Sequence, residues 1–469
     1  MNPLAHAGRL AARSVTAAAG WLDAPIDDLR ITNPVHVLPT RLPVGPAAAG
    51  VIGAVGLAAA ELWRQRTGRA QAVTVDATAA ALATAGNEYL RVNGEPRSDW
   101  GPITGFYRAR GDAWVYLHGN FPHLRDGLLA MLGSASDRAS VAAAVAARDA
   151  DDIEVTAGAR GLCAVRVRPR AAWDALPQAL ATAALPLVEI RRIGDAPPLP
   201  LPDGDAPLAG VRVLDLSRVI AGPMVGRTLA EHGATVMLVS SPKLPSIESL
   251  VIDTGFGKYA AAIELDTAAG HATLESLARG ADVFIDGYRP ASLAARGFSP
   301  QALAALRPGI VCVKLSAFGA TGPWSGRRGY DSLVQSAVGL ARIDTPEPAD
   351  PRRLPFQPLD YLGGYLGAFG AMVALARRSR EGGSWSVRVS LERTARWLWE
   401  MHDAIGPVDA VPAKSPAFDT LGAHLERHNS RFGELACLRA IPSLGETPPR
   451  RRRPPVPLGS DPAAWPVSP

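Results

Sequence analysis

Residues 357–383 have the sequence QPLDYLGGYLGAFGAMVALARRSREGG, and this stretch decides the interpretation of the rest of the chain. One carboxylate, Asp360, precedes sixteen uncharged residues, which are followed by three arginines and a glycine pair. The pattern predicts a long apolar helix with Asp360 as its N-cap, because a carboxylate accepts the unpaired N–H groups of a first turn. The helix dipole would then favour the ionised form of Asp360, and Gly382 would end the helix.

Glycines recur at helical spacing in this stretch, at positions 363, 364, 367 and 370. Each glycine costs about 1 kcal/mol relative to alanine in a helix, so we expect another backbone or a ligand to approach this face closely. Two interpretations of Asp360 remain open. It is a structural cap, or it is a nucleophile in a glycine-lined niche whose backbone N–H groups stabilise an oxyanion.

A similar helix occurs earlier in the chain. Residues 50–81, GVIGAVGLAAAELWRQRTGRAQAVTVDATAAA, align without a gap on residues 364–395, GYLGAFGAMVALARRSREGGSWSVRVSLERTA. In each copy an apolar helix ends in arginines and glycine, and a short alternating strand follows, which indicates common ancestry. The position that matches Asp360 is Pro46, so only the second copy has the carboxylate.

Composition bounds the class of protein. The chain has 469 residues, 47% of them hydrophobic, and a net charge of +5, which suits two or three domains and a small anionic ligand rather than nucleic acid. The three cysteines are far apart and have no metal or disulfide spacing, so we expect a reduced, cytoplasmic location and no metal site. We identify no signal peptide and no apolar run of the length that a membrane span needs.

The chain divides into four segments by pattern. Residues 1–196 hold the first helix copy and a small α/β unit, and the proline-rich residues 197–207 read as a linker. Residues 208–400 alternate strands and helices, with apolar strands at 211–217, 235–239, 281–287 and 309–316. Residues 401–469 are predicted to be an extended tail. The fold class is therefore α/β, with a Rossmann-like, mostly parallel sheet domain and a smaller α/β domain.

Three loops follow the strands of the sheet domain, at 217–227, 286–297 and 316–331. Ligands bind beyond the carboxyl ends of the strands in such sheets, and cationic side chains lie in or near these loops at Arg218, Arg227, Lys258, Arg289 and Arg296. The chain has neither a G-x-G-x-x-G nor a Walker A motif, so the standard dehydrogenase and kinase sites are not indicated.

The segments PLAGVRVLDLSRVIAGPMVGRTLAEHGATV, ADVFIDGYRPASLAARGFSP and PLDYLGGYLGAFGAMVALARR occur in this order within residues 206–400. In this order they resemble the family III CoA-transferases of the CaiB/BaiF type, which include formyl-CoA transferase, carnitine CoA-transferase and α-methylacyl-CoA racemase. Residues 20–190 look like a second, partial copy. The resemblance therefore implies a rearranged member of the family with a partial N-terminal copy.

By that resemblance the chain is an acyl-CoA:carboxylate CoA-transferase whose nucleophile is Asp360. The aspartate would form a mixed anhydride with the acyl group and then an aspartyl-CoA thioester. Coenzyme A would be a substrate, and no cofactor would be tightly bound. The resemblance also implies a homodimer, because only one Rossmann-like unit is visible per chain. The expected CoA-binding residues are Arg218, Lys258, Gly287, Tyr288, Arg289, Arg296 and Tyr330.

Other readings remain possible from the sequence. A 2-methylacyl-CoA racemase needs an acid/base group on each face of the α-carbon, but the racemase histidine is replaced by Tyr330, and near Asn120 there is no acid. His118 and His123 are the nearest substitutes, and we interpret them as ordinary strand-end residues. A non-catalytic acyl-CoA-binding subunit is the third reading. The arginines at 450–453 are interpreted as a solvated tail and not as a nucleic-acid arm.

Overall fold

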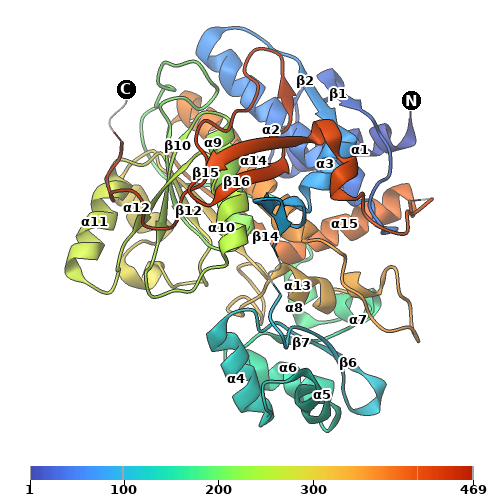
Figure 1. The fold of residues 1–469 in the computed structure, drawn as a ribbon. Helices are drawn as coiled ribbons and strands as arrows, with labels where there is room; N and C mark the ends of the chain where they lie inside the picture. Colours follow the sequence, from blue (N-terminus) through green and yellow to red (C-terminus); the bar gives the residue numbers. More distant parts are fainter. Residues whose placement is uncertain (1, 98–99, 409, 467–469) are drawn as a thin grey trace.

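The computed structural model describes residues 2–97, 100–408 and 410–466. Its centre, within these residues, is a seven-stranded sheet with the order β11-β10-β9-β12-β13-β14-β8 (Figure 1). Six strands are parallel, and β8 is antiparallel to β14. The strands are β8 (Glu189–Gly194), β9 (Arg212–Leu216), β10 (Thr235–Ser240), β11 (Lys258–Ala262), β12 (Val283–Asp286), β13 (Val311–Ser316) and β14 (Ser384–Ser390). The order of the six parallel strands is the doubly wound order, which confirms the predicted fold class.

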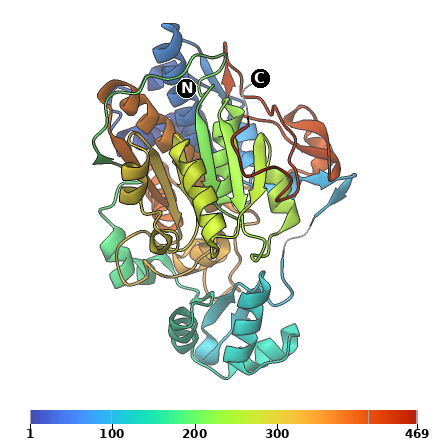
Figure 2. The ribbon, with the colours of Figure 1, turned by 90° about the vertical axis from the view of Figure 1, so that its left-hand side faces the viewer.

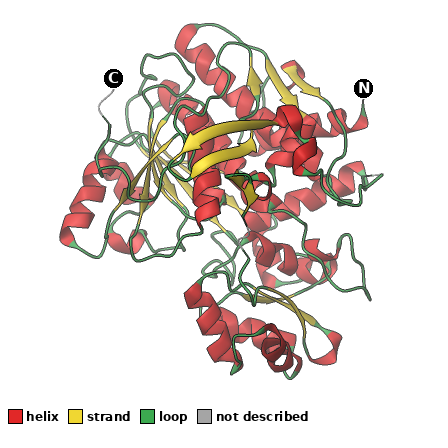
Figure 3. Ribbon diagram, in the orientation of Figure 1, coloured by secondary structure: helices red, strands yellow, loops and turns green. Residues whose placement is uncertain are grey.

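Both faces of the sheet are covered by helices, as the continuous apolar strands predict (Figure 3). Side chains such as Val213 and Val283 enter the core that includes α9 and α14, whereas their neighbours Leu214 and Phe284 enter a second core with α11 and α12. The helices of this domain are α9 (Ala221–Glu231), α10 (Glu248–Thr254), α11 (Ala268–Arg279), α12 (Pro300–Leu306), α13 (Asp331–Ala337), α14 (Pro358–Glu381) and α15 (Leu391–Ile405).

The small domain lies below the sheet domain in Figures 1 and 2 and has a hydrophobic core of its own. Its three antiparallel strands have the order β5-β6-β7 and pack against three helices. The small α/β unit expected within residues 1–196 is therefore present. The elements are β5 (Gly105–Arg108), β6 (Trp114–Leu117), β7 (Ala164–Arg166), α4 (Pro122–Leu132), α5 (Arg138–Ala146) and α6 (Ala150–Ala159), followed by α7 (Arg170–Asp174) and α8 (Pro177–Thr182).

The first helix copy forms a separate layer against α14. Its long helix α2 packs on α1 and on α14, and a three-stranded sheet of order β1-β2-β17 lies beside it. The elements are α1 (Pro3–Ala18), β1 (Leu29–Thr32), α2 (Val44–Thr67), β2 (Val73–Asp76), α3 (Ala77–Ala83), β3 (Arg91–Val92) and β4 (Glu95–Pro96).

The tail differs from the extended segment that the sequence suggested. Strands β15 (Leu425–Ser430) and β16 (Gly433–Leu438) form a hairpin that pairs with β3, and β17 (Ser443–Leu444) joins β2. Residues 435–438 of β16 are all buried, and Gly433 takes a positive φ of 110° at the turn. From residue 445 to 466 the chain has no helix or strand, and residues 467–469 lie outside the described part.

Two helices, α2 and α14, are long and apolar enough to cross a membrane by length and composition alone. However, 89% and 100% of their apolar windows are buried inside the protein. A helix that is apolar all round belongs either to a core or to a membrane span, and here both helices form the core between the two copies.

Candidate active site

A cavity of about 410 Å³ opens beyond the carboxyl ends of β9, β12 and β13. This is the switch point of the doubly wound sheet, where such folds bind ligands. The structure brings together seven of the eight residues predicted from the sequence. Those that line the cavity are Arg218, Gly287, Tyr288, Arg289, Arg296, Tyr330 and Asp360.

Asp360 is the third residue of α14 and not its N-cap. Gln357 is the N-cap residue and makes no side-chain capping bond. The cap comes instead from α13, where Asp331 Oδ2 accepts the backbone N–H groups of Leu359 at 2.7 Å and Asp360 at 2.9 Å. The predicted capping role of Asp360 is therefore wrong, because a carboxylate distant in sequence already serves the first turn. No local pattern in the sequence marks Asp331 for this function.

Burial changes the protonation of this site. The Asp360 residue is 6% exposed, and the loss of water raises the pKa of its carboxyl well above the usual range, with the negative charge of Asp331 adding to the rise. Burial also raises the pKa of Asp331. Burial thus opposes the ionisation of Asp360, whereas the sequence led us to expect that the helix dipole would favour it. When it does ionise, the carboxylate is poorly hydrated and correspondingly reactive toward an electrophile.

The glycines of α14 bring α9 against it. A Cβ on Gly364 would collide with Met224 and lie 2.9 Å from the carbonyl oxygen of Ala221, and one on Gly367 would lie 2.7 Å from Val225. This confirms the predicted close approach of another backbone. Ala221 and Gly222 at the start of α9 line the same cavity as Asp360. The first N–H groups of any α-helix lack intrahelical partners, so this end of α9 offers donors to an anion.

The loop before α9 is strained beside the cavity. Val219 has a φ of 71°, which a β-branched residue rarely adopts. Such a conformation costs about 1–3 kcal/mol and is concentrated at functional sites. Val219 lines the cavity. The sequence gives no sign of this strain, because the residue type alone suggests ordinary strand or helix geometry.

Cationic side chains surround the cavity, more of them than the sequence indicated. Lys243, Arg327 and Arg328 join the three predicted arginines in the lining. Two of the lining cations are partly neutralised, since Arg296 pairs with Asp266 at 2.8 Å and Lys243 with Glu264 at 3.0 Å. Such a cluster suits a ligand with several phosphate or carboxylate groups.

The family model for CoA-transferase family III matches residues 17–198 and 208–405. The chain belongs to this family. The two matched segments cover most of the chain, and the break between them lies at the predicted proline-rich linker. Membership of this family agrees with the fold and with the cationic cavity.

Several relatives are similar to this chain over part of their length. An acetyl-coenzyme A transferase of Hypoxylon pulicicidum is 35% identical over 201 residues, which are 41% of this chain and 33% of that protein. A succinate–glutarate CoA-transferase of Agrobacterium fabrum is 30% identical over 209 residues, covering 41% and 52%. The chain thus spans about half or less of the length of these relatives.

Solved structures are also similar to only part of this chain. A Mycobacterium tuberculosis crystal structure has 28% identity and a TM-score of 0.41, covering 43% of this chain and 59% of that one. A CaiB/BaiF family protein from Brucella suis has 24% identity and a TM-score of 0.39, covering 49% and 65%.

Lys258 does not join the other predicted CoA-binding residues. Its side chain is 1% exposed, and its Nζ donates to Asp215 at 2.8 Å and to the carbonyl of Pro223 at 2.6 Å. We therefore remove it from the candidate site. The charge serves to hold the start of α9 on β9, which the residue's position at the start of a strand did not reveal.

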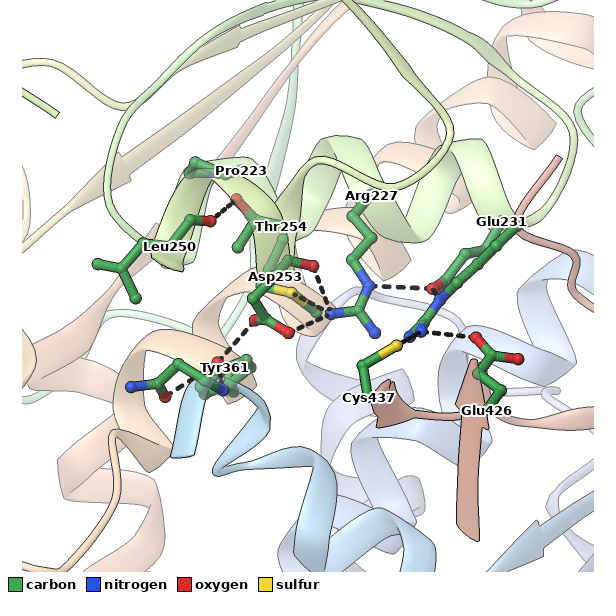
Figure 4. A network of polar contacts seen from close by, with 12 residues as sticks. Pro223, Arg227, Glu231, Leu250, Asp253, Thr254, Tyr361, Glu426 and Cys437 are labelled. Carbon is green, nitrogen blue, oxygen red and sulfur yellow. Dashed lines mark hydrogen bonds and ion pairs between the residues drawn. The ribbon is translucent and has the colours of Figure 1, made fainter. Parts of the chain in front are cut away.

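Arg227 likewise has a structural role (Figure 4). It pairs with Glu231 at 3.0 Å and with Asp253 at 3.2 Å, and Asp253 accepts a hydrogen bond from Tyr361, the neighbour of the nucleophile candidate, at 2.8 Å. Arg451 of the tail joins Glu231 at 3.0 Å with only 2% of its side chain exposed. The prediction that this arginine is solvated is wrong, because the acidic pocket behind α9 needs a second cation.

The racemase reading gains little from the geometry. Tyr330 lines the cavity and stacks on His118 of the small domain, with ring centroids 4.1 Å apart. Burial lowers the pKa of His118 to about 3, so the ring is neutral at ordinary pH. His123 lines the cavity, but burial and then the nearby arginines lower its pKa as well.

Proposed function

We propose that the chain transfers CoA from an acyl-CoA to a carboxylate, with Asp360 as the covalent nucleophile. The observation that carries this proposal is the position of Asp360, a buried carboxyl that lines a cavity surrounded by cations. CoA has a diphosphate and a 3′-phosphate, and arginine side chains pair well with phosphates. We assign the CoA-binding role to Arg218, Gly287, Tyr288, Arg289, Arg296 and Tyr330.

The first half-reaction forms an anhydride and then a thioester on Asp360. The carboxylate attacks the thioester carbonyl carbon, the carbon–sulfur bond breaks, and CoA leaves as a thiolate. The product is a mixed anhydride of Asp360 and the acyl group. The thiolate then attacks the aspartyl carbonyl carbon and expels the acyl group as a carboxylate, which leaves aspartyl-CoA thioester.

The second half-reaction repeats these steps with the acceptor. The acceptor carboxylate attacks the aspartyl thioester, and the thiolate then attacks the acceptor carbonyl and restores Asp360. One carboxylate replaces another throughout, so the reaction needs no ATP. Asp331 holds the first turn of α14 through two backbone N–H groups and so fixes where Asp360 stands. The free N–H groups of α9 would stabilise the oxyanion that forms in each attack.

The test is chemical trapping of the intermediate. Hydroxylamine added during turnover should leave a hydroxamate on the peptide that contains Asp360, detectable by mass spectrometry. Asp360→Asn should abolish transfer and trapping while CoA still binds, because Asp331 and not Asp360 supplies the helix cap. Transfer that continues in Asp360→Asn would refute the proposal.

Trapping together with a deuterium-exchange measurement separates the other two readings. A racemase would exchange the α-hydrogen of a 2-methylacyl-CoA for deuterium without transferring CoA. A non-catalytic subunit would bind acyl-CoA, but neither transfer nor hydroxamate would appear. A cytoplasmic location also remains a prediction.

A further inference from the structure

Asp360 also lines a second, smaller cavity, of about 40 Å³. This cavity shares Val219, Ile220, Tyr330 and Asp360 with the large cavity, so the nucleophile candidate stands at the boundary between the two. In a thioester the acyl substituent and the sulfur lie on different sides of the carbonyl carbon. If CoA occupies the cationic cavity, the acyl group has the small cavity available to it.

The size and lining of this cavity restrict its occupant. A cavity of this volume holds about three non-hydrogen atoms, since a water needs about 10–15 Å³ on the same measure. Two buried polar atoms of lining residues, His118 Nε2 and Gln357 Oε1, have no hydrogen-bond partner. An unpaired buried polar group costs about 1–3 kcal/mol. Among the described lining residues there is no arginine or lysine to neutralise a distal carboxylate.

We propose that this cavity is the acyl pocket and that it selects a short acyl group with an uncharged polar substituent, such as a hydroxyl. This inference rests on the proposed transferase function. A hydroxyl would pair with His118 or Gln357, whereas a second carboxylate would lack a cation and lie near Asp331, which also lines the cavity.

The test compares acyl donors of different length and polarity on the full chain. We expect kcat/KM for 3-hydroxypropionyl-CoA to exceed that for succinyl-CoA and octanoyl-CoA by at least tenfold. Gln357→Leu should remove most of the advantage of 3-hydroxypropionyl-CoA over propionyl-CoA, with CoA affinity unchanged and folding checked by circular dichroism. His118→Leu serves as a second variant if Gln357→Leu does not fold.

A preference for succinyl-CoA or octanoyl-CoA would overturn the acyl-pocket proposal. An unchanged hydroxyl preference in both variants would also overturn it. Failure of the transferase proposal looks different, because then none of the donors would give a hydroxamate at Asp360.

A different observation concerns the two helix copies, which are equivalent in structure as well as in sequence. Their alignment has a constant offset, 364 − 50 = 314 residues. The helices α2 (Val44–Thr67) and α14 (Pro358–Glu381) begin and end at positions that differ by this same offset. Each is followed by a strand, β2 or β14, that has one parallel neighbour and one antiparallel neighbour. The valines that meet Gly56 and Gly370, at 2.6 and 2.5 Å from an added Cβ, are also equivalent.

The contact between α2 and α14 is the kind that a two-fold axis produces. Ser379 Oγ lies 2.8 Å from Gln65 Oε1, and these residues are 379 − 65 = 314 positions apart. A residue meets its own equivalent only on the axis of an isologous interface. The contact that two identical chains would make across such an axis is made here within one chain.

We infer that the N-terminal copy takes the place of a partner subunit, so that one polypeptide forms a complete pseudo-dimer with a single site. The first copy has Pro46 in place of the nucleophile, and α1 lies over its helix, with Gly8 O 2.6 Å from an added Cβ on Gly50. The small domain that follows this copy reaches the site of the second copy. His123 lines the large cavity, Phe121 lines the small one, and the Arg218 guanidinium lies 5.1 Å from the centre of the Phe121 ring. The homodimer was expected because only one Rossmann-like unit is visible per chain; under this inference the first copy supplies the partner's contact, so a second chain is not needed to complete the site.

Light scattering and CoA titration on the full chain test this inference. We expect a mass near that of one 49.1 kDa chain, one CoA bound per chain, and specific activity that does not fall on dilution. Mixing Asp360→Asn chains with Phe121→Ala/His123→Ala chains should restore no activity.

Restored activity in the mixture, or CoA binding that is lost as a dimer dissociates, would overturn the inference. The mass and the CoA stoichiometry decide the matter even if the chain proves to have no transferase activity.

Discussion

Replacing Lys258 with methionine tests whether this cation belongs to the core or to the CoA site. Lys258 and Asp215 have side-chain exposures of 1% and 0%. Removal of the lysine leaves a buried carboxylate with only the hydrogen bond from Ser217. Losing one partner of a buried ion pair destabilises a protein by about 3–5 kcal/mol, so Lys258→Met should lower the free energy of unfolding by this amount in urea titrations.

The matched control removes both charges. In Asp215→Asn/Lys258→Met no unpaired charge remains, so we expect the double variant to recover about half or more of the lost stability. The affinity for CoA, measured by calorimetry on folded protein, should change less than threefold in the double variant. If Lys258 instead contacted a phosphate, its loss would cost about 1.5–3 kcal/mol of binding, or roughly 10- to 100-fold in Kd. Unchanged stability together with such a loss of affinity would refute the structural role.

Three further outcomes are expected. Arg289→Ala should weaken CoA binding by about 1.5–3 kcal/mol. Arg296→Ala should weaken it less, because Arg296 already has an acidic partner. If calorimetry gave the same CoA affinity for Arg289→Ala and the unaltered chain, the proposed CoA site would be contradicted. Gly364→Ala should destabilise the fold, since overpacking costs about 1–3 kcal/mol against about 1 kcal/mol gained in helix propensity. Gly363→Ala, whose added Cβ meets its nearest neighbour at 3.4 Å, should be neutral or stabilising, and the reverse order in urea titrations would exclude the α9 contact. Burial and a neighbouring carboxylate raise the pKa of Asp360, and the ionised form is the one that attacks. We therefore expect kcat/KM to rise with pH, with a midpoint above the ordinary carboxyl pKa of about 4. A pH profile of kcat/KM that is already flat at about pH 5 would contradict this.

The sequence predicted the fold because its strands are continuous apolar runs and its loops carry the cations. Arg218, Arg289 and Arg296 could be placed from the rule that ligands bind at the carboxyl ends of parallel strands. Lys258 lies at the other end of its strand, as the first residue of β11, and its side chain is buried in the core beside Asp215. Its position relative to the strand could not be read from the residue type alone. Asp331 was missed because its partners are backbone N–H groups in another helix, 28 residues or more away. Such pairing depends on tertiary packing alone.

The hairpin at residues 425–438 also depends on tertiary packing that the local sequence does not show. Their alternation is short and is broken by charged residues, so the hairpin forms only because β3 and the core beside α10 accept its apolar side chains. Arg451 is a second residue whose environment the local sequence did not show. It was interpreted as solvated because prolines surround it in the sequence. The acidic pocket that buries it is assembled from α9 and the hairpin.

The edge strands β8 and β17 have a consequence for synthesis of the chain on the ribosome. Glu189 in β8 pairs with Arg388 in β14, and Val73 in β2 pairs with Leu444 in β17, so each pairing waits for a much later part of the chain to emerge. Until then the nascent N-terminal part exposes unpaired strand edges, which favour misassembly. Contacts of such long sequence separation also slow folding. Production of this protein should therefore depend strongly on chaperones and on low expression temperature.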